Sequence, residues 1–85
     1  MKDIDFDWEE RKASINLKKH GISFDEAKSV FYDDNGLHMP DPDHSREEER
    51  FILIGVSQHL RMLLVCHCYR RDDSIIRIIS ARKAS

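Results

Sequence analysis

The stretch Ser74-Ile75-Ile76-Arg77-Ile78-Ile79-Ser80-Ala81-Arg82 decides the fold of this chain. It is rich in β-branched residues and too short for a buried helix, so it predicts a β-strand. Alternation would place Ile75, Arg77, Ile79 and Ala81 on one face and Ile76, Ile78, Ser80 and Arg82 on the other. Both faces are mostly apolar, which indicates a central strand covered on both sides. The two arginines of this strand could bind a phosphate. The strand alone favours a structural role, in which each arginine pairs with a carboxylate or extends to the edge of the sheet.

Four more strands are expected before this one. Arg50–Val56 and Arg61–Tyr69 are strongly apolar runs separated by a short turn, and a second short turn leads to the last strand. Three strands joined in this way predict an antiparallel meander. Shorter strands are expected at Asp3–Trp8, where acidic and apolar residues alternate, and at Leu37–Met39.

Two helices are expected between the first two strands. The first should begin at a capping pair formed by Asp7 and Glu10 and end near His20. The second should begin at the capping box Ser23-Phe24-Asp25-Glu26 and end at Asp33-Asp34-Asn35-Gly36. A strand, two helices and then a run of strands is the order of an α+β protein. We therefore expect two N-terminal helices packed on one face of a small antiparallel sheet.

Composition suits one small domain over residues 1–85, with 40% hydrophobic and 35% charged residues. No apolar run approaches the ~20 residues of a membrane helix, and the acidic N-terminus is no signal peptide. No membrane association and a cytoplasmic location are therefore expected. The net charge of −2 argues against a strongly basic nucleic-acid binder, although residues 60–85 carry a net +4. Cys66 and Cys68 are expected to be buried, reduced thiols.

No metal site and no cofactor are predicted. The polar segment Asp41-Pro42-Asp43-His44-Ser45, with His38 nearby, superficially resembles a metal site. Two histidines and two carboxylates at this spacing match no defined metal motif. The segment is therefore expected to be a solvated turn.

Residues that could cleave a phosphodiester lie on the predicted strands. His67 and Tyr69 share one face of their strand, and the neighbouring strands add Arg50, Arg77 and Arg82. Such cleavage needs a base for the 2′-hydroxyl proton, an acid for the leaving oxygen and fixed cations for the transition state, but no magnesium. The sequence does not fix the strand register, so it does not establish that these side chains meet in one site. The alternative is that His67 and Tyr69 are a half-buried pair with a structural role.

Several segments, taken in order, cover nearly the whole chain: Phe6-Asp7-Trp8-Glu9, Lys19-His20-Gly21-Ile22-Ser23-Phe24 with Glu26-Ala27, Asp43-His44, Glu49-Arg50-Phe51, Cys66-His67-Cys68-Tyr69-Arg70 and Ile76-Arg77-Ile78-Ile79-Ser80-Ala81-Arg82. In these segments the sequence resembles the BrnT family, which are toxins of type II toxin–antitoxin pairs. The resemblance implies a fold like that of the RelE and ParE toxins. It also implies a metal-independent ribonuclease that halts translation.

The resemblance further implies RNA as the substrate and a ribbon-helix-helix antitoxin as the partner. The antitoxin would bind operator DNA, and the pair would repress its own operon. Family members usually continue past Ala81-Arg82-Lys83-Ala84 into a C-terminal helix. A chain that ends at Ser85 is expected to lack this helix and to leave apolar sheet surface uncovered. The free chain is then expected to self-associate as a homo-oligomer or to aggregate.

The sequence hypothesis assigns catalysis to His67, Tyr69, Arg77 and Arg82, and substrate binding to Lys19, His20 and Arg50. Lys19 or His20 competes with His67 and Tyr69 for the proton-transfer role. Two alternatives stay open. One is a non-catalytic protein that acts as the antitoxin-binding half of an autorepressor, and the other is a toxin that acts on a protein target such as gyrase.

Overall fold

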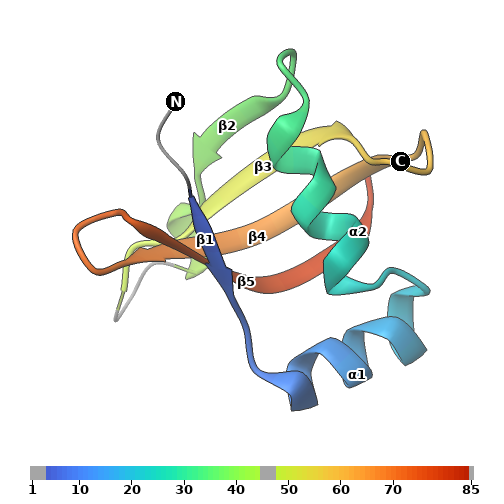
Figure 1. The fold of residues 1–85 in the computed structure, drawn as a ribbon, viewed down its shortest axis with the longest axis horizontal. Helices are drawn as coiled ribbons and strands as arrows, with labels where there is room; N and C mark the ends of the chain where they lie inside the picture. Colours follow the sequence, from blue (N-terminus) through green and yellow to red (C-terminus); the bar gives the residue numbers. More distant parts are fainter. Residues whose placement is uncertain (1–3, 45–47, 85) are drawn as a thin grey trace.

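The computed structural model describes residues 4–44 and 48–84, so Asp3, Ser45 and Ser85 lie outside the described residues. A five-stranded sheet has the order β1-β5-β4-β3-β2 (Figure 1). Its strands are β1 (Asp5–Asp7), β2 (Leu37–Pro40), β3 (Phe51–Val56), β4 (Met62–Arg70) and β5 (Ile75–Lys83). The expected meander of β3, β4 and β5 is confirmed, and β2 pairs antiparallel with β3. Because β1 pairs in parallel with β5, the sheet is mixed and not purely antiparallel.

The two expected helices are α1 (Glu10–His20) and α2 (Phe24–Ser29), and a 3₁₀ turn, η1 (Val30–Tyr32), continues α2. Figure 1 shows α2 lying across one face of the sheet, while α1 lies beside β5 beyond the end of β1. A second 3₁₀ turn, η2 (Pro42–His44), follows β2. Among the described residues, no helix has the length and apolar character needed to cross a membrane. The α+β class is confirmed.

The core lies between the helices and the face of the sheet beneath α2, which we call the inner face. It is built from ten buried side chains: Ile22, Phe24, Ala27, Val30, Leu53, Leu63, Val65, Ile76, Ile78 and Ala81. Gly55 of β3 lets η1 approach closely, because a Cβ there would lie 2.9 Å from Val30 Cγ1. Burial of these apolar side chains is the main force that holds the helices on the sheet.

A β-bulge in β5 interrupts the expected alternation of side chains. Ser80 pairs with Cys66 and Ile78 pairs with His67, which leaves Ile79 without a partner on β4. One extra residue shifts the phase of the strand by one position. The two halves of β5 therefore follow different alternation patterns.

The bulge corrects the predicted faces of β5. Ala81 lies in the core with Ile76 and Ile78, whereas it was expected on the opposite face. Ser80 and Arg82 pair with Cys66 and Leu64 and share their side of the sheet, because opposed residues share a face. We call this side, opposite α2, the outer face. Residues of β5 on it are half-buried or exposed, so the expected full cover on both sides is wrong.

Asn16 of α1 forms hydrogen bonds with the backbone of β5 beyond the end of β1, where the described residues provide no neighbouring strand to do so. Its Nδ2 donates to Ala81 O at 2.8 Å, and its Oδ1 accepts from Ala81 N at 3.1 Å. Nδ2 also donates to Ile22 O at 3.0 Å, and the residue is only 5% exposed. The carboxamide satisfies backbone groups that would otherwise be unpaired, and it fixes α1 to β5.

One of the two expected helix caps is confirmed. Ser23 Oγ accepts a hydrogen bond from Glu26 N at 3.1 Å and so caps α2. The N-cap of α1 is Glu9, whose side chain makes no capping bond. The expected Asp7–Glu10 pair is wrong, because the Asp7 carboxylate accepts from an arginine of β5 at 2.6 Å.

Candidate functional site

The structure brings His67 and Tyr69 together on the inner face and adds His38 from β2. Tyr69 Oη lies 3.1 Å from His38 Nε2, and the Nε2 atoms of the two histidines are 3.2 Å apart. Phe31 meets the His67 ring edge-on, and Phe51 stacks on His38. This group, which we call the His38 cluster, joins the edge strand β2 to the central strand β4.

The contacts of the two imidazoles indicate which nitrogen supplies the hydrogen between them. Val65 O can only accept, so His67 Nδ1, 3.2 Å away, carries a hydrogen. Burial lowers the pKa of His67 to about 4, so the ring is neutral near pH 7 and its Nε2 is an acceptor. The hydrogen between the two rings therefore belongs to His38 Nε2.

The His38 cluster supports a structural role for His67. Its side chain is fully buried and cannot touch an RNA strand. Burial also raises the pKa of Tyr69, which keeps the phenol protonated. The cluster secures the end of β2, from which the chain continues into Asp41.

We expect His67 to make folding stability depend on pH. The unfolded ring binds a proton below about pH 6.5, but the folded ring does so only near pH 4. The contribution of His67 to stability is therefore fully present above pH 6.5 and is lost as the pH drops toward 4. The free energy of unfolding should fall by about 2 kcal/mol between pH 7.5 and 5. Urea unfolding at both pH values should show this loss in the wild type and a smaller loss in His67→Phe. Equal losses in both proteins would show that His67 is not the source of this pH dependence.

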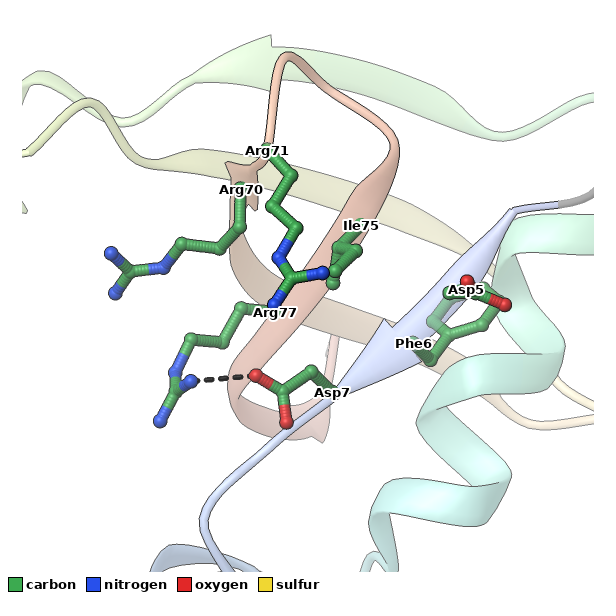
Figure 2. Close-up of a pocket in the computed structure, with 7 residues that line it drawn as sticks. All are labelled: Asp5, Phe6, Asp7, Arg70, Arg71, Ile75 and Arg77. Atoms are coloured by element: carbon green, nitrogen blue, oxygen red, sulfur yellow. Dashed lines mark hydrogen bonds and ion pairs between the residues drawn. The ribbon is translucent and has the colours of Figure 1, made fainter.

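Arg77 lies in a pocket at the β1 edge of the sheet, far along β5 from Arg82. Figure 2 shows Arg70, Arg71 and Arg77 around this pocket, with the Arg77 guanidinium paired to Asp7 at 2.6 Å. Arg70 pairs with Glu48 at 3.0 Å. These carboxylates offset much of the positive charge, so the geometry favours an ion-paired role for Arg77.

A groove on the outer face brings Arg50 and Arg82 together, and we call it the Arg82 groove. Its volume is about 400 Å³. Its polar lining residues are Asp41, Asp43, Arg50, Cys66, Ser80 and Arg82. Ile52, Leu64 and Ile79 form the apolar part of its wall. Arg82 is exposed and forms no ion pair with any residue that the structure describes, so its guanidinium is available to an anion.

Two carboxylates, those of Asp41 and Asp43, line the Arg82 groove. Burial, reinforced by the charge of Asp41, raises the pKa of the Cys66 thiol, which therefore stays protonated near neutral pH. Asp41 is buried, contrary to the expected solvated turn, and its N donates to Arg50 O at 2.9 Å. Since arginine does not deprotonate, Asp41 and Asp43 remain as the described lining groups that can accept a proton.

The sequence model of one family matches residues 8–85, nearly the whole chain. That family is described as "Ribonuclease toxin, BrnT, of type II toxin-antitoxin system". The chain belongs to the BrnT family. Membership of a type II toxin–antitoxin system supports a cognate antitoxin as its partner.

The BrnT fold of this chain is also seen in a solved structure. The chain is similar to the Brucella abortus ribonuclease toxin BrnT, whose crystal structure was determined at 1.1 Å, with a TM-score of 0.75. The two are 22% identical, and the similarity covers 98% of this chain and 99% of that one. No curated protein matches the sequence.

In this BrnT protein the expected site residues are divided among four places. Arg50 and Arg82 meet in the Arg82 groove, while His67 and Tyr69 lie on the opposite face. Arg77 lies at the β1 edge. Lys19 and His20 line a further pocket of α1, beside the groove.

Proposed function

We propose that this chain cleaves RNA in the Arg82 groove without a metal ion and thereby inhibits translation. The observation that carries the proposal is the exposed Arg82 guanidinium, placed in one groove with Arg50 and two carboxylates. A guanidinium presents a planar fork that matches two phosphate oxygens. Membership of a ribonuclease toxin family supports RNA as the molecule that brings this phosphate.

The proposed reaction is attack of a ribose 2′-oxygen on the adjacent phosphorus. A carboxylate of Asp41 or Asp43 accepts the 2′-hydroxyl proton as the new P–O bond forms. The bond from phosphorus to the 5′-oxygen breaks, and that oxygen takes up a proton from solvent water. The products are a 2′,3′-cyclic phosphate and a 5′-hydroxyl. Arg82, with Arg50 beside it, stabilises the extra negative charge of the transition state, which is the task that a metal ion performs in other nucleases.

The proposal is tested with purified protein and single-stranded RNA in the presence of EDTA. We expect cleavage at an unchanged rate, and products that end in a cyclic phosphate and a 5′-hydroxyl. A 2′-O-methyl group at the cleaved nucleotide should abolish the reaction, because it removes the nucleophile. Loss of cleavage in EDTA would overturn the metal-independent mechanism. Absence of cleavage in every condition would favour a non-catalytic, antitoxin-binding role.

The partner proposed for this toxin is a ribbon-helix-helix antitoxin in the cytoplasm. Type II toxin–antitoxin membership supports the antitoxin, and the resemblance of the sequence to the family supports its fold. In this proposal operator DNA contacts the antitoxin, and the toxin joins the repressor only through it. Apolar side chains exposed on the outer face, among them Leu37 and Met62, supply surface for such a partner.

A further inference from the structure

One face of α1 carries three basic side chains around an anchored residue. Lys12, Lys19 and His20 lie four before, three after and four after Asn16, so all of them lie on the same side of the helix. Asn16 fixes that side to the backbone of Ala81 through two hydrogen bonds. The basic face is therefore held against β5 by the fold and does not depend on a mobile surface loop.

These side chains line a pocket of about 190 Å³, which we call the α1 pocket. Ile79 and Ser80 of β5 form its other wall. The same two residues line the Arg82 groove. The α1 pocket and the Arg82 groove are therefore neighbours that meet at the bulge of β5, and a chain-like ligand in the groove can continue into the pocket.

The α1 pocket is positively charged. No carboxylate appears in its described lining, in contrast to the arginine pocket beside β1. Lys12 lies 3.6 Å from Glu9, but both side chains are about half exposed, and such surface pairs are weak. The C-terminal end of α1 contributes roughly half a negative charge, which cannot offset Lys19 together with Lys12.

We infer that the α1 pocket binds a phosphate of the RNA strand that flanks the cleaved bond. This inference rests on the proposed ribonuclease function, since it extends the path of the same strand from the Arg82 groove. The phosphate contact is independent of base identity, so it adds affinity and aligns the strand without reading its sequence. Lys19 is a substrate-binding residue in this arrangement and takes no part in proton transfer.

Lys18 offers a matched control for Lys19. Both are exposed lysines in the last turn of α1, but only Lys19 lines the α1 pocket. We expect Lys19→Ala to weaken binding of a short 2′-O-methyl RNA, measured by fluorescence anisotropy, by about fivefold to tenfold. Lys18→Ala should change it less than about twofold. The slope of log Kd against log salt should fall by about 0.7 for Lys19→Ala alone, because one phosphate contact is lost.

A second substrate separates this inference from the proposed function. A dinucleoside monophosphate carries only the cleaved phosphate, so its KM should be the same in wild type and Lys19→Ala. Equal effects of Lys18→Ala and Lys19→Ala on the oligonucleotide, or an effect of Lys19→Ala on the dinucleotide, would overturn the inference. Because the 2′-O-methyl RNA cannot be cleaved, its binding tests the pocket even if the chain proves inactive.

Discussion

Arg82→Lys and Arg82→Ala should each lower RNA cleavage by about 10²–10³-fold, the cost of losing one donor that stabilises transition-state charge. Lysine keeps the positive charge but loses the planar fork that grips two phosphate oxygens. The melting temperature should stay nearly unchanged, because Arg82 is exposed and forms no ion pair within the described residues. Single-turnover cleavage and thermal unfolding, measured on the same proteins, check both expectations.

Lys83→Ala is the matched control for Arg82. Lys83 is the next residue of β5, is exposed and pairs with Leu63, so it lies on the inner face. Its substitution removes the same charge one residue away from the Arg82 groove and should leave cleavage nearly intact. A large fall in melting temperature for Arg82→Ala, with normal cleavage by the folded fraction, would instead make Arg82 a structural residue.

Arg61→Ala should lower the free energy of unfolding by about 2 kcal/mol, because it leaves the buried Glu26 carboxylate without its cation. The loss is smaller than for a fully buried pair, since the Arg61 side chain is 35% exposed. The Glu26 side chain is 3% exposed. Arg61 meets it with two guanidinium nitrogens, one of them at 2.9 Å, and Ser57 Oγ donates at 2.6 Å. The group ties α2 to the β3–β4 turn. A fall of roughly 8–16 °C in melting temperature is expected for a domain of this size.

The pH dependence of this effect provides a check. Arg61 lowers the pKa of Glu26, so the pair stabilises the fold above the usual carboxyl range and is lost as the pH falls below it. The difference between wild type and Arg61→Ala should therefore shrink in acid. Arg11→Ala, an exposed arginine of α1, should change stability by less than about 0.5 kcal/mol. A loss of under about 1 kcal/mol for Arg61→Ala would place the pair among ordinary surface ion pairs.

Local patterns in the sequence predicted the elements but not every partner. Ser23 and Glu26 correctly indicated the start of α2, yet the Glu26 side chain pairs with Arg61, thirty-five residues away. Asp7 had the spacing of a cap, but its carboxylate is used by Arg77. In both cases the carboxylate pairs with an arginine that is distant in the sequence, and a local sequence pattern cannot predict such a contact.

The candidate site was predicted in part. Arg82 and Ser80 were expected on one face and do line one groove. Strict alternation predicts that they share a face with Ile76 and Ile78, which is wrong. A β-bulge cannot be recognised from a run of isoleucines. His38 was interpreted only together with the polar loop that follows it, and its contact with His67 and Tyr69 was not predicted. The signal that could have found it is alternation, since His38 is the only polar residue in the strand Leu37–Met39.

Placing His67, Arg77 and Arg82 on one sheet was correct, whereas Arg50 lies just before β3. Alternation, however, does not say which faces of neighbouring strands coincide. That depends on register, and the register here pairs His67 with Ile78 and Leu64 with Arg82. Residues 67 and 64 point to opposite sides of β4. The imidazole and the guanidinium are therefore separated by the thickness of the sheet.

The unpaired Ile79 links two cavities that would otherwise be independent. Its side chain belongs to the wall of the Arg82 groove and to that of the α1 pocket. A change of size at this one position would alter the width of both compartments together and would leave every charged group in place. In the proposed function, a substitution of Ile79 by another apolar residue would therefore change which RNA strands fit, without changing the charge of either cavity. If RNA occupies both cavities as proposed, the residue that adjusts their width is thus distinct from the residues that carry their charge.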